Sequence, residues 1–391
     1  MYHLIYSNRL LLLIVATLFA QNLFAQKEKL SVIKANSTHV DILENNKLLK
    51  NNSWTIMPEE ELDVYATCAK KVTFRTDLES ITFDIDPKIG EYNFIILLNE
   101  KDSARTQIKY YPSFLFKKTR LEILKGAGKY NDSDNRFIPE FTYQSEDNQH
   151  LKRIREELKL DSIAGKGSEL SQIFNLLHWI HYLIRHDGNS DNPTQKNAID
   201  LIQICKTENR GVNCRMMAMI LNECYLSMGI KSRYITCMPK ETQFDDCHVI
   251  NMVFSKDLDK WIWIDPTFGV YVMDEKGNLL GIQEVRERLI KGNPLIINAD
   301  ANWNRESLQT KQHYLDYYMA KNLYRMECPL SSEYNSETWE KGKEIAYVEL
   351  LPLDALEQSP QKREETRQKT GVKFINYKTN NPNLFWAKPN N

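Results

Sequence analysis

The sequence predicts an α+β protein in which a β-rich N-terminal domain precedes a core that combines helices with antiparallel strands. Short runs with a period of two fill residues 30 to 115, helical periodicity starts near residue 147, and strand-like runs return after residue 232. A period of two is typical of half-buried strands, and a period near 3.6 is typical of amphipathic helices. Separate groups of strands and helices in this order indicate the α+β class.

The N-terminal strands are predicted from apolar side chains that alternate with polar ones. Breaks at Asp86-Pro87 and between Asn99 and Asp102 divide the runs, as turn residues do between strands. The alternating residues are Val72 and Phe74, then Ile81, Phe83 and Ile85, then Tyr92, Phe94, Ile96 and Leu98, then Thr106, Ile108 and Tyr110. We therefore expect a small antiparallel β-sandwich within residues 26–145, and we interpret it as a binding or packing module.

Length and charge limit the classes of protein that need to be considered. The 391 residues are enough for two or three domains, and the hydrophobic share of 42% allows a sizeable core. Lys and Arg number 51 and Asp and Glu number 52, so the formal net charge is −1. This balance gives no electrostatic reason to expect nucleic acid or an anionic membrane as a partner.

The first 25 residues have the layout of a signal peptide. Arg9 supplies a positive charge, an apolar run extends from Leu10 to Ala20, and Ala25 offers a cleavage point before Gln26. The apolar run is too short to span a bilayer comfortably. We expect residues 1–25 to be removed from an exported protein, periplasmic or secreted, with no stable membrane insertion afterwards. An uncleaved N-terminal anchor is the alternative.

The core is predicted from helix starts and strand runs. Asp147 can cap a first helix, Ser168 a second one, and Asn213 a third one that ends near Met228 before Gly229. The strand-like runs that follow are Ser232 to Thr236, His248 to Phe254 and Trp261 to Ile264. We expect residues 146–300 to form one domain, the core named above.

The last part of the chain has a weaker pattern. We expect residues 301–391 to be a C-terminal extension that packs on the core. It contains one predicted helix, Lys311 to Tyr324, and a run of mixed charge from Lys362 to Lys369 that we interpret as a solvated helix face.

Cys214 is the candidate nucleophile. It follows Gly211-Val212-Asn213, and Asn213 as an N-cap places it in the first turn of the third helix. Unpaired backbone amides and the helix dipole stabilise a thiolate there, and the same amides can donate to an oxyanion. The odd total of seven cysteines leaves at least one thiol unpaired within the chain. The alternative is a small buried residue that happens to begin a helix.

His248 and Asp265 are predicted to face each other on a hairpin. The turn from Ser255 to Lys260 separates their two runs. Facing positions in an antiparallel pair have a constant sum, and pairing Val253 with Lys260 gives the same sum as His248 with Asp265. Pairing Phe254 with Trp261 makes His248 and Asp265 diagonal neighbours instead. Either register lets the carboxylate reach the imidazole, although a packed strand histidine and an ordinary turn aspartate remain alternatives.

These three residues suit thiol chemistry together. A thiol becomes a strong nucleophile when a base takes its proton, and a carboxylate fixes the tautomer of a histidine base. The segments are GVNCRMMAMILNECYLSMGIKSRYI, then CHVINMVF, then KWIWIDPTFG. They resemble the transglutaminase-like superfamily, in the manner of an exported bacterial member, over roughly residues 165 to 297.

The resemblance implies a papain-like, transglutaminase-like core in which a helix carrying the nucleophile packs on an antiparallel sheet. By matching motif positions, it implies that Cys214 is the nucleophile, His248 the general base and then acid, and Asp265 the orienting carboxylate. It also implies acyl transfer from a peptide or carboxamide through a Cys thioester. Water as acceptor would make the enzyme a protease or amidase, which we favour, and a lysine amine would make it a cross-linking transglutaminase. A non-catalytic binding or scaffold module on the same fold is the third reading.

The remaining expectations concern partners and the rest of the site. We expect a peptide or protein substrate, and neither a cofactor nor a metal. The second oxyanion donor is not assigned by the sequence, and its candidates are Gln203, Asn209 and Asn213. Cys247 beside His248 raises the alternative of a disulfide, and His178 and His181 are interpreted as packed helix histidines.

Overall fold

The computed structural model describes residues 30–56, 58, 63–110, 118–241 and 246–389. The predicted signal peptide, residues 1–25, lies outside these ranges. The chain divides into two compact units, Met1–Phe116 and Lys117–Asn391. Among the described residues, no helix has both the length and the apolar character needed to cross a membrane.

The first unit contains two four-stranded sheets. In one the strand order is β3-β2-β5-β6 and every neighbour is antiparallel, and in the other it is β1-β7-β8-β4. The strands are β1 (Ser31–Ala35), β2 (His39–Glu44), β3 (Lys47–Thr55), β4 (Asp63–Thr67), β5 (Lys71–Arg75), β6 (Ser80–Asp84), β7 (Glu91–Leu98) and β8 (Asp102–Tyr110).

Buried side chains of the two sheets form one core. Phe74 of β5 meets Phe94 of β7 edge to face, with ring centroids 4.9 Å apart. The expected antiparallel arrangement is wrong for the second sheet, because β1 runs parallel to β7 and β4 runs parallel to β8. Alternation of apolar residues reports which face of a strand is buried and carries no information on strand direction.

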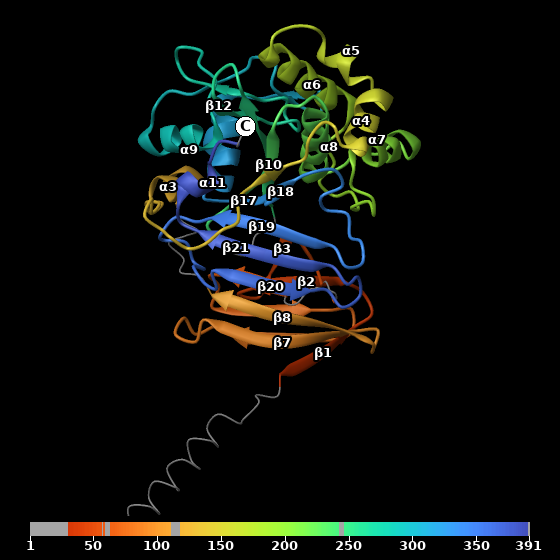
Figure 1. Cartoon of the computed structure of the whole chain (residues 1–391). Coiled ribbons are helices and arrows are strands. Elements are labelled where there is room, and N and C mark those ends of the chain that lie inside the picture. Colours follow the sequence, from red (N-terminus) through yellow and green to blue (C-terminus); the bar gives the residue numbers. More distant parts are fainter. Residues whose placement is uncertain (1–29, 57, 59–62, 111–117, 242–245, 390–391) are drawn as a thin grey trace, which may run out of the picture. The chain divides into compact units, whose positions relative to one another are not determined.

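The second unit is built on a seven-stranded sheet with the order β12-β11-β10-β17-β19-β21-β20 (Figure 1). All neighbours are antiparallel except β19 and β21, which run parallel. The strands are β10 (Ser232–Met238), β11 (His248–Ser255), β12 (Lys260–Ile264), β17 (Arg325–Pro329), β19 (Glu344–Leu350), β20 (Lys362–Thr366) and β21 (Lys373–Thr379).

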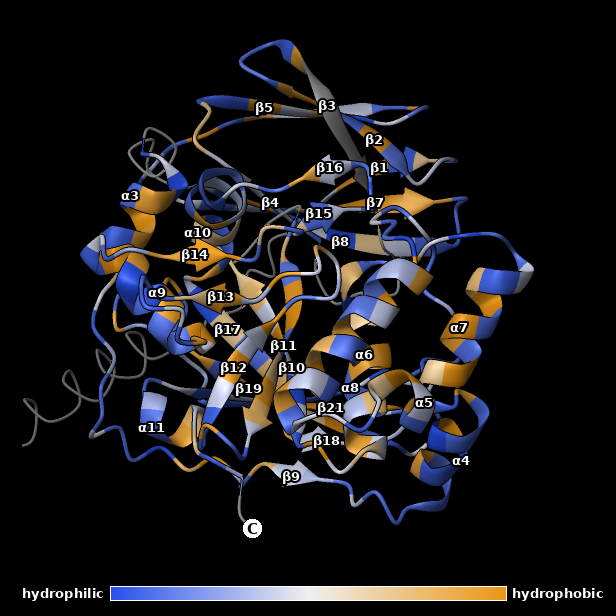
Figure 2. Ribbon diagram, turned by 90° about the horizontal axis from the view of Figure 1, so that it is seen from above, coloured by the Kyte–Doolittle hydropathy of each residue, from blue (hydrophilic) through white to orange (hydrophobic). Residues whose placement is uncertain are grey.

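Helices cover the sheet on both faces, and separate apolar clusters lie under each group (Figure 2). On one face Met217 of α8 and Leu177 of α6 pack with Val249 of β11. On the other face Val285 of α9 and Leu315 of η1 pack with Trp263 of β12. The first group is α4 (Gln149–Glu157), α5 (Leu160–Ala164), α6 (Glu169–Leu183), α7 (Ala198–Thr207) and α8 (Cys214–Ser227), and the second is α3 (Arg120–Lys125), α9 (Ile282–Lys291), the π-helix η1 (Gln312–Met319), α10 (Ala320–Asn322) and α11 (Pro382–Phe385).

Three two-stranded ladders complete the unit. They pair β13 (Val272–Met273) with β14 (Ile296–Ile297), β15 (Asn302–Trp303) with β16 (Ser307–Leu308), and β18 (Ser331–Ser332) with β9 (Thr142–Tyr143).

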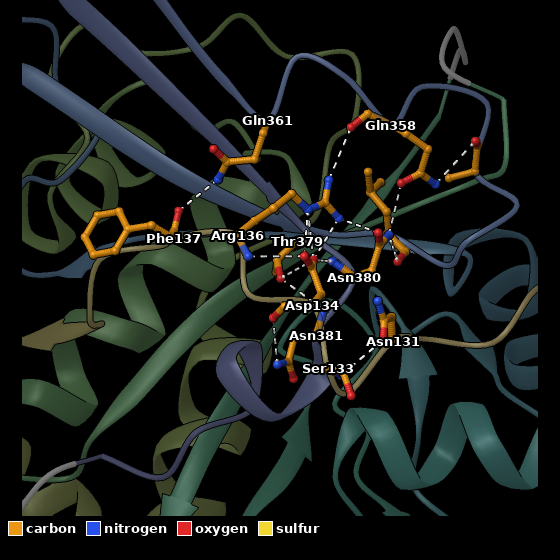
Figure 3. A network of polar contacts seen from close by, with 12 residues as sticks. Asn131, Ser133, Asp134, Arg136, Phe137, Gln358, Gln361, Thr379, Asn380 and Asn381 are labelled. Atoms are coloured by element: carbon orange, nitrogen blue, oxygen red, sulfur yellow. Dashed lines mark hydrogen bonds and ion pairs between the residues drawn. The ribbon is translucent and has the colours of Figure 1, made fainter.

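The boundary between the units lies between residues 116 and 117, whereas we expected it near residue 145. A polar network ties the segment after α3 to the end of β21 (Figure 3). The Asp134 carboxylate accepts the backbone N–H of Asn380 at 2.7 Å and pairs with Arg136 at 2.8 Å. Burial opposes ionisation of Asp134, but the Arg136 and backbone donors outweigh it and lower its pKa to about 2. These contacts of Asp134 hold the segment after α3 against the second unit, so residues 118–145 belong to that unit.

Residues 301–391 are an integral part of the core and not an extension on its surface. They supply β17, β19, β20 and β21, four of the seven strands of the central sheet. The interpretation of Lys362 to Lys369 as a helix face is also wrong, since Lys362–Thr366 is an edge strand paired with β21. An edge strand with charged side chains has no apolar alternation to reveal it.

Candidate functional site

Cys214 is the first residue of α8. Asn213 is the N-cap, and its side chain accepts the backbone N–H of Met216 at 3.1 Å, as the sequence predicted. The next residue, Arg215, anchors this helix start on the sheet through Thr236 of β10 at 2.7 Å and through the buried Glu337. Cys214 itself is half-buried at this helix start.

His248 and Asp265 meet where β11 begins and β12 ends. Phe254 pairs with Trp261, which is the second of the two registers the sequence allowed, and it makes His248 and Asp265 diagonal neighbours. His248 Nε2 lies 2.7 Å from Asp265 Oδ2, and the two side chains are only 1% and 0% exposed. This contact leaves His248 Nδ1 for other partners.

The Asp265 carboxylate accepts hydrogen bonds from several donors besides His248. Its Oδ1 accepts the backbone N–H of Thr267 at 2.8 Å and of Phe268 at 3.4 Å. Its Oδ2 also accepts the Tyr314 hydroxyl at 2.5 Å, and that hydroxyl in turn accepts the Trp263 indole N–H at 3.1 Å. These donors satisfy both oxygens of a carboxylate whose side chain is 0% exposed.

The Cys214 thiol is a hydrogen-bond partner of both His186 and His248. Burial opposes its ionisation, but the hydrogen bonds from the two histidines, the His248 charge and the Val249 backbone N–H lower the Cys214 pKa to about 6. Burial likewise opposes the charged form of His248. The Asp265 charge and hydrogen bond, together with Cys214, nevertheless raise the His248 pKa to about 10. Near neutral pH the two groups form a thiolate–imidazolium pair.

Aromatic rings enclose the His248 imidazole. The Tyr318 hydroxyl lies 3.3 Å from His248 Nδ1. Phe268 packs edge to face against His248, Tyr314 and Tyr318, with centroids 5.5, 5.2 and 5.7 Å apart. Tyr314 and Tyr318 both come from η1, in agreement with the frequent use of π-helical turns at functional sites.

His186 was missed by the sequence analysis. It lies in the loop after α6, at a bridge to Val212, two residues ahead of Cys214. Of the earlier candidates for the second oxyanion donor, Gln203 and Asn209 have exposed side chains and Asn213 is the helix cap. A single histidine between a helix end and a polar loop carries no motif, so only the three-dimensional structure brings it to the sulfur.

Asparagines of the segment 298–304 bond to His181 and to the segment that follows Asp265. Both ring nitrogens of the buried His181 bond to oxygens, Nδ1 to the Pro266 carbonyl at 3.0 Å and Nε2 to Asn302 Oδ1 at 3.1 Å. Asn298 donates to the Gly269 carbonyl at 2.8 Å. His181 thus packs inside the protein, as predicted, and joins the segment after Asp265 to the segment that carries Trp303.

The other cysteines of the described residues are free thiols, like Cys214. Cys247 is half-buried, and burial together with the nearby Cys214 raises its pKa to about 11. The described residues contain no group of three or more His, Cys, Asp or Glu side chains arranged to hold a metal ion.

No known family model matches the sequence, and no curated protein does. Solved structures do match. A candidate cysteine protease from Cytophaga hutchinsonii is 22% identical over 30% of this chain and 37% of its own, with a TM-score of 0.24. A protein described as a TGase is 14% identical over 46% of each chain, with a TM-score of 0.22.

The transglutaminase of red sea bream is 11% identical over 62% of this chain and 50% of its own, with a TM-score of 0.22. This chain therefore matches half or less of the length of each of these proteins. The structural neighbours are a candidate cysteine protease and transglutaminases, but at these scores the likeness does not identify a family. The function has to be inferred from the side chains.

Proposed function

We propose that this chain is an exported thiol enzyme that transfers an acyl group from a peptide or carboxamide carbonyl to water through a thioester on Cys214. The observation that carries the proposal is the combination of Cys214, a half-buried residue at a helix start whose thiol pKa is lowered to about 6, and the buried His248–Asp265 pair. Perturbed pKa values of this kind, together with a geometric partner, are typical of catalytic groups.

The reaction follows from the charges at the site. The Cys214 thiolate attacks the carbonyl carbon, a sulfur–carbon bond forms, and the π electron pair moves to the oxygen. The intermediate collapses when the carbon–nitrogen bond breaks, and His248 Nδ1 gives its proton to the leaving amine. His248 then takes a proton from water, which attacks the thioester and releases the carboxylic acid and the thiolate.

Asp265 keeps the His248 imidazole in a useful state throughout. Because its Oδ2 accepts the Nε2 proton, the second nitrogen Nδ1 is the one that exchanges protons with the thiol and the amine. The donors to Asp265 come from backbone and from Tyr314, so the carboxylate does not need to move during the cycle.

Selective alkylation tests whether Cys214 is the nucleophile. Iodoacetamide carrying a fluorophore, at low concentration and pH 7, should label the wild type mainly on Cys214, and Cys214→Ala should lose most of the signal. Cys247→Ala is the matched control, since Cys247 is also half-buried but has a raised pKa. Equal labelling of wild type and Cys214→Ala would overturn the proposal.

The acceptor is tested separately, on the purified mature chain with casein as substrate. Release of peptides that depends on Cys214 supports hydrolysis. Incorporation of a fluorescent primary amine, without peptide release, would show that the thioester is passed to amines and that the hydrolytic part of the proposal is wrong.

A further inference from the structure

Backbone hydrogen bonds hold His186 beside the start of the Cys214 helix. The strand-like bridge between the two segments is closed by Val212 N–H to the Arg185 carbonyl at 3.1 Å and Asp187 N–H to the Val212 carbonyl at 2.9 Å. Asn304 adds a reciprocal pair with His186 itself, donating to its carbonyl at 3.0 Å and accepting its N–H at 2.7 Å. The backbone of His186 is therefore fixed next to the start of α8.

The Trp303 indole determines the tautomer of His186. Its Nε1–H lies 3.3 Å from His186 Nδ1. An indole N–H can only donate, so Nδ1 must be the acceptor and the ring proton must sit on Nε2. With Nδ1 occupied as an acceptor, Nε2–H is the ring donor that remains for the Cys214 thiol, with which the His186 side chain forms a hydrogen bond.

The two histidines that meet the sulfur therefore differ in what they can do. His248 has a carboxylate on Nε2 and is stabilised as a cation, so it can take and return a proton. His186 instead has an indole donor, and on the other ring nitrogen, Nδ1, which leaves Nε2–H as a donor. An N–H donor held beside the nucleophile suits an oxygen that becomes negative during the reaction.

We propose that His186 is a catalytic residue that donates its Nε2–H to the carbonyl oxygen of the bound acyl group, with Trp303 as the positioning residue that sets its tautomer. This inference rests on the proposed function. The backbone N–H of Cys214 is the second donor, because the first N–H groups of a helix have no partner within the helix.

The step is balanced within the site. When the thiolate attacks, the carbon–oxygen π pair becomes a lone pair on oxygen, and the His186 and Cys214 N–H groups bond to it. When the intermediate collapses, the carbonyl re-forms and the leaving group departs with its bonding pair. His186 keeps its proton from start to finish.

Two reagents separate this role from an effect on the thiol. Acylation by p-nitrophenyl acetate passes through an oxyanion, and its burst of p-nitrophenolate reports the rate. Alkylation by iodoacetamide is a direct displacement at carbon that forms no oxyanion. Each rate constant is taken at the plateau of its own pH profile, where Cys214 is ionised, and the ratio of acylation to alkylation isolates the stabilisation of the oxyanion.

The ratio should fall about 100-fold in His186→Ala, as expected for loss of one oxyanion donor. His186→Gln keeps a side-chain N–H and should recover part of the loss, and Trp303→Phe, which frees the tautomer, should show a smaller fall. His178→Ala, a histidine of α6 that pairs with Asp300, is the control and should keep the wild-type ratio.

Two outcomes would overturn the role of His186 while leaving the proposed function intact. One is an unchanged ratio in His186→Ala that retains the thermal melting profile of the wild type. The other is a shift of the midpoints of both pH profiles to higher pH without a fall in the ratio, which would assign His186 to the ionisation of the sulfur. A wild type that is alkylated at Cys214 but shows no burst would instead contradict the proposed function, and His186 with it.

Discussion

Replacing Asp265 by asparagine should raise the pKa of Cys214, although the two side chains do not touch directly. The amide keeps the shape of the carboxylate but removes the charge that holds His248 protonated. Backbone donors occupy Oδ1, so the amide nitrogen would replace Oδ2 and face His248 Nε2. His248 Nε2 would then have to accept from the amide, which moves the ring proton to Nδ1, the atom that must accept from the thiol.

The size of the effect follows from the pKa of the thiol. With a pKa of about 6, roughly 0.9 of Cys214 is thiolate at pH 7, whereas the ordinary value of 9.0 leaves roughly 0.01. Asp265→Asn should therefore lower the rate of a reaction that needs the thiolate by roughly 10- to 100-fold at pH 7. Because His248 stays protonated up to about pH 10 in the wild type, the ion pair spans about pH 6 to 10.

The assay is alkylation of Cys214 by iodoacetamide from pH 4 to pH 10, followed by mass spectrometry of the Cys214 peptide. The wild-type rate should reach half of its plateau near pH 6. In Asp265→Asn the midpoint should move towards pH 9, and the rate at pH 7 should fall by 10- to 100-fold. Asp259→Asn is the control, since Asp259 lies on the same hairpin and is exposed. Superimposable profiles for Asp265→Asn and wild type would refute the reasoning.

Three further predictions concern stability, each measured by urea unfolding. Tyr314→Phe should lower the free energy of unfolding by about 2–3 kcal/mol, because Asp265 loses a donor and Trp263 loses an acceptor. The control Tyr317→Phe, at an exposed position, should stay within about 0.5 kcal/mol of wild type. Equal losses of stability in the two variants would contradict this prediction. Leu177→Ala should lower the free energy of unfolding by about 2–5 kcal/mol, because it leaves a cavity between α6 and α8. A loss below about 1 kcal/mol would show that neighbouring side chains move to fill the cavity. Gly269→Ala should lower the free energy of unfolding by at least about 1 kcal/mol, because φ is +61° and the new Cβ would meet the His181 ring at 3.1 Å. An unchanged urea midpoint would refute this strain.

The parts of the site that could be predicted from sequence are those with local signals. Asn213 before an apolar-periodic run marked the start of the Cys214 helix, and the structure has that cap. The strand pattern around a charged turn indicated the hairpin that carries His248 and Asp265, and the choice between two registers was left to the packing of the sheet.

The residues that surround this core of the site could not be predicted because their signals are not local. Tyr314 and Tyr318 lie four apart on a π-helix, whose turns do not follow the 3.6 period used to recognise helices. His186 and Trp303 come from separate loops, and only the folded chain brings the indole to the imidazole. The C-terminal strands were missed for a similar reason, since their place in the sheet depends on pairing with distant segments.

The contribution of the late segments to the sheet has a consequence for biosynthesis. A ribosome adds Gln312, where η1 begins, 98 positions after Cys214 (312 − 214), and β17 to β21 follow later still. Until those residues emerge, β10 has no partner on its outer side and Asp265 lacks the Tyr314 hydroxyl. The nascent polypeptide therefore carries Cys214, His248 and Asp265 before the strands and the Tyr314 hydroxyl that complete their surroundings, and the second unit can close its sheet only when its last segments have emerged.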